Sequence, residues 1–137
     1  MLFYMQRYHS QTQLYKILMH PTRLAILDQL RDGEQCVCHM EAVLGQRQAH
    51  ISQHLMLLRD AGLVSDRRDG WNIFYRVVRP EIYAVLDSMN ALCGESPGNL
   101  LALDIRAHKE ACPCPKCHAS EPSTGLEKPA LVNMDVD

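Results

Sequence analysis

Apolar residues recur every three or four positions through much of this chain, which is the period of an amphipathic helix. Residues 22–79 contain no proline, so we expect continuous secondary structure in this part of the chain. Prolines and glycines mark the ends of individual segments. In chain order, the predicted helices cover about residues 10–19, Pro21 to Gly33, about 40–44, about 47–61, Pro80 to about Leu92, and about 100–105.

Two short stretches between the fourth and fifth predicted helices have the composition of strands. Residues 63–65 and 71–77 are rich in β-branched, aromatic and aliphatic side chains. The Asp69-Gly70 pair between them is typical of a tight hairpin turn. The predicted fold is therefore mainly α with a small β-hairpin. Two short helices joined by a glycine-containing turn and followed by a hairpin make a winged helix-turn-helix.

The fourth predicted helix has a polar face of a kind that reads DNA. Residues 46–54 include three glutamines, two histidines, one arginine and one serine, while the apolar stripe of the same helix is expected to face the core. Glutamine can pair with an adenine edge, and serine and arginine can contact base edges or phosphates. We predict base-edge contacts from Gln48, His50, Ser52 and Gln53, with Gln46 on the same face, and phosphate contacts from Arg47 and from Arg67 and Arg68 at the hairpin tip.

Two segments carry a more specific pattern, HPTRLAILDQL and GEQCVCHMEAVLGQRQAHISQHLMLLRDAGLVSDRRDGWNIFYRV. Over about residues 13–79 the chain resembles the ArsR/SmtB family of small winged-helix repressors. The resemblance implies a homodimer that binds an imperfect inverted repeat in double-stranded operator DNA and is released when an inducer binds. Arg47 stands where family members more often have Ser or Thr, and Ala49-His50 replaces a frequent Pro-Thr. The departures imply an unusual operator.

Cys36 and Cys38 lie at the start of the third predicted helix, where backbone N–H groups favour thiolates. Taken alone, such a pair is equally compatible with small buried side chains. The segment EQCVCHM, however, resembles the metal-binding box of the same family, usually Glu-Leu-Cys-Val-Cys-Asp-Leu. Thiolates bind soft ions such as arsenite, antimonite, Cd(II) or Pb(II) better than hard ions. In arsenite sensors a third cysteine commonly follows the pair by three residues, and here that position is Glu41.

Three cysteines near the C-terminal end are the predicted source of the missing donor. They either form a local three-thiolate site or reach the first pair in either protomer. The predicted metal ligands are Cys36, Cys38, Cys112, Cys114 and Cys117, with arsenite or antimonite as the first candidate inducer, Cd(II) or Pb(II) as the second, and no organic cofactor. A zinc site of the SmtB kind is not expected, because Arg106 stands where its first histidine would be.

The remaining cysteine and four of the histidines are given structural roles. Cys93 follows the hairpin on the fifth predicted helix and is assigned to core packing. Surface or helix-capping positions are predicted for His9, His20, His39 and His108.

Composition and charge favour one folded domain with a tail. The chain has 137 residues, of which 47% are hydrophobic, and a net charge of −2. Residues 1–109 carry +1 and residues 110–137 carry −3. We expect a winged-helix DNA-binding and dimerisation domain over 1–111 and a Cys/Pro-rich, acidic tail over 112–137. A near-neutral body does not exclude DNA binding, because a local arginine cluster can supply the positive field.

Several classes of function are disfavoured. No run of about 18 apolar residues exists, so a membrane span is not expected. The first ten residues carry polar and basic side chains, unlike a secretory signal, so we expect a cytoplasmic protein with thiols rather than disulfides. An enzyme or metal chaperone is disfavoured because no convincing His/Asp set or phosphate-binding glycine loop is present. A repressor that senses thiol oxidation through the same cysteines stays open.

Overall fold

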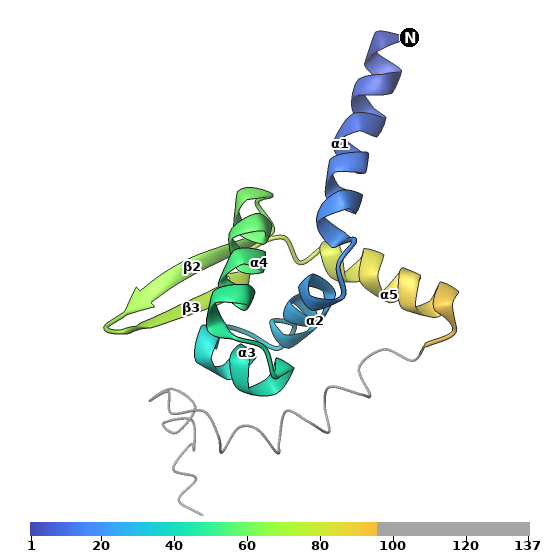
Figure 1. Cartoon of the computed structure of the whole chain (residues 1–137). Helices are drawn as coiled ribbons and strands as arrows, with labels where there is room; N and C mark the ends of the chain where they lie inside the picture. Colours follow the sequence, from blue (N-terminus) through green and yellow to red (C-terminus); the bar gives the residue numbers. More distant parts are fainter. Residues whose placement is uncertain (96–137) are drawn as a thin grey trace, which may run out of the picture.

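The structure, a computed structural model, describes residues 1–95 (Figure 1). Four of the predicted helices and the hairpin are found close to their predicted positions, and the first helix is longer than predicted. The elements are α1 (Leu2–Leu18), α2 (Pro21–Gln29), β1 (Gln35–Cys36), α3 (Val37–Leu44), α4 (Gln48–Asp60), β2 (Val64–Asp69), β3 (Asn72–Val77) and α5 (Ile82–Cys93). The helix predicted around 100–105 and the tail predicted over 112–137 lie outside the described residues.

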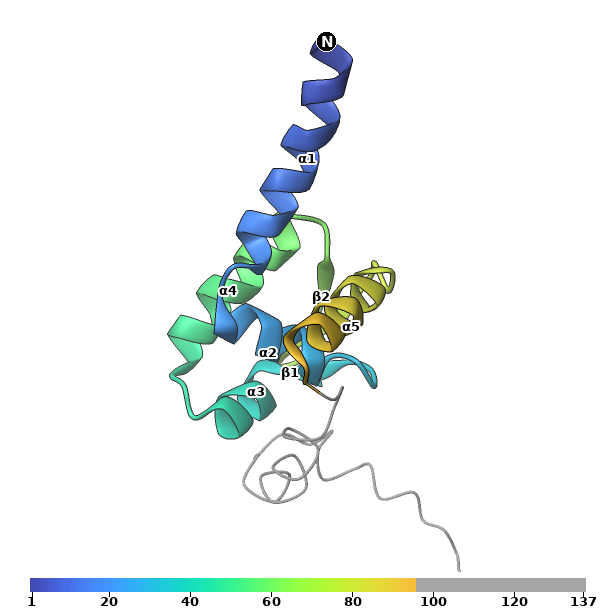
Figure 2. The ribbon, with the colours of Figure 1, turned by 90° about the vertical axis from the view of Figure 1, so that its right-hand side faces the viewer.

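Helix α1 begins earlier than the prediction of about residue 10, because residues 2–9 contain no proline or glycine that would end it. The prediction rested on Leu14, Ile17 and Leu18, which are the residues of α1 that pack against the core. Figures 1 and 2 both show the N-terminal part of α1 protruding from the rest of the described chain. No helix within residues 1–95 is both long and apolar enough to cross a membrane.

The core lies where α2, α3 and α4 meet the sheet. Ile26 and Leu27 of α2, Met40 of α3 and Ile51 and Leu55 of α4 have no exposed surface. Burial of side chains of this size contributes about 1.5–3 kcal/mol each to folding. The buried residues of α4 follow the predicted three- and four-residue spacing, so the opposite face of α4 is left to solvent.

Helix ends are defined by local hydrogen bonds. The imidazole Nδ1 of His20 accepts a bond from the Thr22 N–H at 3.2 Å, and Pro21 occupies the first turn of α2. His20 is therefore a capping residue, as predicted. Helix α3 ends at Gly45, which has a φ of 62°. This left-handed conformation favours glycine, and it turns the chain toward α4.

The three strands form an antiparallel sheet in the order β1-β3-β2. Strands β2 and β3 form the predicted hairpin, and Gly70 at its tip has a φ of 60°. Strand β2 runs to Asp69, so Arg67 and Arg68 lie within the strand and not, as predicted, at the tip. Strand β1 was not predicted, because two residues are too few to show an alternating pattern. It places Cys36 opposite Phe74 of β3. The start of α3 is thereby attached to the wing, by which we mean the β2-β3 hairpin.

Two further single-residue predictions are wrong. Cys93 does not pack in the core of the described chain. It is the exposed last residue of α5, next to the capping residue Gly94. His39 is not at the surface, because only 2% of it is exposed. It lies four residues before Val43, which is also buried, so both face inward from the same side of α3.

Candidate DNA-binding face and thiol site

The polar face of α4 is presented to solvent as predicted. Gln48, His50 and Gln53 are exposed, and Ser52 is half-buried beside them. Arg47 is exposed at the N-terminus of α4, where no side chain caps the helix. The first turn of α4 therefore combines a cationic side chain with backbone N–H groups that side chains do not cap, which is an arrangement suited to a phosphate.

Gln46 has a different environment from the other residues of that segment. Its amide nitrogen donates to the Thr22 hydroxyl at 3.0 Å, and its side chain is half-buried. This bond joins the turn before α4 to the start of α2. Gln46 thus helps to hold the turn between α3 and α4 against α2.

The two wing arginines lie on opposite faces of β2, since neighbouring residues of a strand alternate. Arg68 is exposed opposite Ile73. Arg67 lies opposite Phe74, with its guanidinium carbon 4.9 Å from the centre of the Phe74 ring. Both oxygens of Glu34 accept bonds from Arg67, at 2.6 Å from Nη2 and 3.2 Å from Nε.

Cys36 and Cys38 come together where β1 passes into α3. Their Sγ atoms lie 2.6 Å apart, and the Cys36 Sγ also accepts a bond from the His39 N–H at 3.2 Å. Cys36 is 2% exposed and Cys38 is half-buried. A backbone N–H directed at sulfur favours the thiolate, the form that binds metal ions. The geometry therefore fits a chelating pair of thiolates.

A third donor for this pair is not found in the described part of the chain. Within residues 1–95, no group of three or more His, Cys, Asp or Glu side chains could hold a metal ion. The predicted ligands Cys112, Cys114 and Cys117 lie outside the described residues. Glu34, which precedes the pair closely in sequence, is bonded to Arg67.

Three imidazoles gather at the junction of α2 and α4. The His50 and His54 Nε2 atoms lie 3.1 Å apart, and the ring centres of His20 and His54 lie 4.2 Å apart. Burial lowers the pKa of His54, and the neighbouring His20 and His50 lower it further. His54 was counted with His50 on the polar face of residues 46–54, but it is only 7% exposed and lies beside His20.

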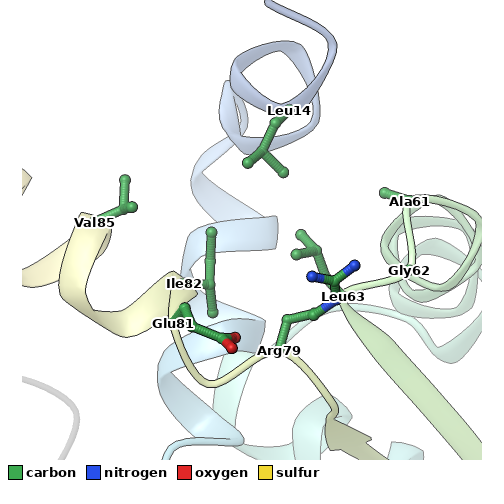
Figure 3. A pocket seen from close by; sticks show the side chains of 8 residues that line it. All are labelled: Leu14, Ala61, Gly62, Leu63, Arg79, Glu81, Ile82 and Val85. Atoms are coloured by element: carbon green, nitrogen blue, oxygen red, sulfur yellow. The ribbon is translucent and has the colours of Figure 1, made fainter. Parts of the chain in front are cut away.

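Large apolar side chains are exposed on α1 and α5. They include Phe3, Met5 and Tyr8 on α1 and Val85, Met89 and Leu92 on α5. A hollow of about 370 Å³ lies between these helices. In Figure 3, Leu14 of α1 and Ile82 of α5 point toward it. Its lining residues are Leu14, Ala61, Gly62, Leu63, Arg79, Glu81, Ile82 and Val85.

Sequence comparison places this chain among bacterial regulators. Residues 20–66 match the family model described as "Bacterial regulatory protein, arsR family". The arsenical resistance operon repressor of Escherichia coli is 48% identical over 66 residues, which cover 47% of this chain and 56% of that protein. The biofilm growth-associated repressor of Agrobacterium fabrum is 39% identical over 79 residues, which cover 58% of this chain and 68% of that protein.

Structural comparison confirms the predicted winged helix-turn-helix. Reduced HlyU from Vibrio cholerae has a TM-score of 0.61 and 29% identity, covering 67% of this chain and 97% of that chain. A Mycobacterium bovis domain described as a homodimeric winged helix-turn-helix DNA-binding domain has a TM-score of 0.58 and 26% identity. That match covers 68% of this chain and 86% of the other.

Proposed function

This chain belongs to the ArsR family of bacterial regulatory proteins, and we propose that it is a homodimeric repressor whose operator complex is dissociated by a thiophilic ion. The two relatives named above are repressors, which supports a role as a regulator and not as an enzyme. The observation that carries the proposal is the pair of facing sulfurs of Cys36 and Cys38 at the start of α3. Only three residues separate α3 from α4, the helix proposed to read DNA.

DNA recognition is assigned to α4 and the wing. The exposed side chains of Gln48, His50 and Gln53, together with Ser52, are proposed to contact base edges in the major groove. Arg47 and Arg68 are proposed to contact phosphates. Gln46 and Arg67 belong to the same predicted interface. Their bonds to Thr22 and Glu34 support a role in positioning the interface before DNA binds.

Dimerisation is assigned to α1 and α5. Their exposed apolar side chains would be covered by a second copy of the chain, and burial of apolar area is the main driving force of such contacts. The description of the Mycobacterium bovis domain as homodimeric supports this assignment. In such a dimer, two α4 helices would enter major grooves about 34–36 Å apart on one side of the duplex.

The proposed inducer is a soft ion, with arsenite first and Cd(II) or Pb(II) second. Two thiolates supply part of a three-coordinate site, and Cys112, Cys114 or Cys117 of either protomer is proposed to supply the rest. The name of the Escherichia coli relative, an arsenical resistance operon repressor, supports arsenite. The ion would change the orientation of α3 and, through the short turn, that of α4.

Mutation of the thiol pair tests this proposal. Operator binding is measured by fluorescence anisotropy on the promoter upstream of the protein's own gene, with As(III), Sb(III), Cd(II), Pb(II) and Zn(II) titrated in turn. We expect Cys36→Ser with Cys38→Ser to bind operator as the wild type does and to resist dissociation by the ion. Cys93→Ser, which alters an exposed thiol on α5, is the matched control and should respond as the wild type does. Wild-type release in the double variant would remove the pair from the mechanism.

A second function is favoured by the same geometry. Because the two sulfurs already face each other, a peroxide could oxidise them to a disulfide with little movement of the chain. Both thiol protons and two electrons pass to the peroxide, which is reduced to water. Titration of free thiols on the operator-bound protein separates the two functions. A redox sensor loses two thiols as peroxide dissociates the complex, whereas an ion sensor recovers all its thiols once a chelator removes the ion.

A further inference from the structure

A continuous row of side chains joins the thiol pair to the wing. Phe74 of β3 is the direct cross-strand partner of Cys36 on one side and of Arg67 on the other. Directly opposed residues point to the same face of a sheet, so the three side chains are neighbours on one face. The Phe74 ring packs against Cys36 and Cys38, and Arg67 covers the ring.

Glu34 binds the last member of this row, and we call the pair of Glu34 and Arg67 the clamp. Glu34 precedes β1, and its two carboxylate oxygens hold the guanidinium of Arg67, 33 residues away on β2. A single exposed ion pair contributes little to stability, but a two-point Arg–carboxylate contact fixes orientation as well as distance. The segment that carries the cysteines and the wing that follows α4 are thereby joined outside the helix-turn-helix.

We propose that Glu34 and Arg67 are positioning residues that transmit ion binding at Cys36 and Cys38 to the wing. This inference rests on the proposed function. Cys36 and Phe74 are 2% and 3% exposed, whereas Cys38 is half-buried, so the Cys36 sulfur is the one enclosed by packing. An ion bound to both sulfurs must therefore displace a neighbour, because a close-packed cluster does not absorb added volume. Phe74 is the aromatic neighbour, and its movement shifts Arg67 and with it β2.

The test compares two conservative variants that alter different partners of Arg67. Glu34→Gln breaks the link to the cysteine segment. Asp69→Asn alters a weaker contact within the wing itself, where the Asp69 Oδ2 lies 3.6 Å from the Arg67 Nη1. Both substitutions remove one negative charge beside Arg67, so they change the local charge equally. Only the first breaks a bond between the cysteine segment and β2, and the pairing of β1 with β3 is kept in both variants.

Three quantities are measured on the full-length protein. They are the operator dissociation constant without ion, the same constant with saturating arsenite, and the arsenite affinity of DNA-free protein from thiolate-to-arsenic absorption. A typical coupling of about 1–3 kcal/mol makes the ratio of the two operator constants roughly 5–150 in the wild type. We expect Asp69→Asn to keep this ratio and Glu34→Gln to lower it. Arsenite affinity should stay unchanged in both variants, and each ratio is taken against the ion-free operator constant of the same variant.

Trp71, the only tryptophan of the chain, reports on the wing without DNA. It is fully exposed, next to Gly70 at the hairpin tip. Arsenite should change its fluorescence anisotropy in wild-type and Asp69→Asn protein and leave it unchanged in Glu34→Gln.

Several results would overturn the inference. A wild-type ratio in Glu34→Gln means that the clamp transmits nothing. Weakened arsenite binding in that variant places Glu34 in the ion site instead, and equal loss of coupling in Asp69→Asn assigns the effect to wing charge. Failure of wild-type protein itself to release operator with any ion refutes the proposed function, and the inference falls with it. The last result is distinguished from the others because it requires no variant.

Discussion

Individual residues of the wing differ in their surroundings although they are adjacent in sequence. Arg67 is held by Glu34 over the Phe74 ring, whereas Arg68 points to solvent from the other face of β2. Arginines near a hairpin turn are recognisable from sequence, but their partners are not. Because side chains alternate along β2, Arg67 and Arg68 lie on opposite faces of the strand, and we propose different roles for them.

Arg68→Ala should weaken DNA binding about equally on operator and unrelated duplexes. A phosphate contact carries no sequence information, and its loss reduces the slope of log affinity against log salt by about one unit. Binding of both duplexes is measured by anisotropy over a salt series. A loss confined to the operator would instead show that Arg68 reads a base.

His54 should make the folded state sensitive to mild acid. Its pKa lies below the ordinary 6.5, because burial and the neighbouring imidazoles disfavour the charged form. The unfolded chain therefore binds a proton more readily than the folded one, so stability is full above about pH 6.5 and falls as the pH drops through that value.

Urea unfolding at pH 7.5 and pH 5.5 checks this expectation. The unfolding midpoint should be lower at pH 5.5 in the wild type, and the difference should shrink in His54→Gln. An equal difference in the variant would show that another group is responsible.

Residue-level prediction succeeded where the signal is local. The position of Cys36 and Cys38 at a helix start indicated the pair, because Cys36 precedes the first helical residue and its side chain can turn back over the first turn. The contact between Glu34 and Arg67 could not be predicted, since it depends on a three-stranded register between distant segments. Burial of His39 and exposure of Cys93 likewise depend on which side of a helix faces the core.

Among the elements, the turn between α3 and α4 sets how α4, the helix proposed to read DNA, follows Cys36 and Cys38. Gly45 ends α3 with a φ of 62°, and a Cβ at this position would meet nothing within 4 Å. The cost of a side chain there is therefore conformational and not steric. This turn was recognisable from sequence as a glycine after the last apolar residue of a helical stretch.

Gly45→Ala should lower the free energy of unfolding by about 1 kcal/mol, because alanine is disfavoured in the left-handed region. Gly45→Asn should lose less, since asparagine tolerates that conformation. Chemical denaturation of both variants gives the comparison. Equal losses would mean that the left-handed conformation is not what makes glycine necessary.

Elements with a clear period or turn were predicted well, and those without were not. Helices α2 to α5 have apolar spacing and glycine or proline at their ends, and the hairpin has its Asp69-Gly70 turn. Strand β1 has only two residues, which is too short to show an alternating pattern. The extension of α1 carries large apolar side chains, but they are exposed and not directed at the core of the described chain.

The molecule as a whole leaves α1 and α5 with exposed apolar side chains, which we assign to contact between protomers. Met89→Glu should shift the protein toward monomer, because a charge would have to be buried in an apolar interface. Met56→Glu is a matched control, since Met56 on α4 is 50% exposed and Met89 is 49% exposed. Sedimentation velocity gives the oligomeric state. A monomer–dimer equilibrium unchanged by Met89→Glu would exclude this face of α5 from the interface.

We propose that ion binding and operator binding weaken each other, and that α3, α4 and the wing carry this coupling. Linkage requires that DNA weaken ion binding by the same factor by which the ion weakens DNA binding. Arsenite affinity is therefore measured for the free protein and for its operator complex, which gives one ratio. Operator affinity is measured with and without arsenite, which gives the second ratio. The two ratios should agree, at roughly 5–150 for a typical coupling. Equal arsenite affinity in the free and DNA-bound protein would contradict the account.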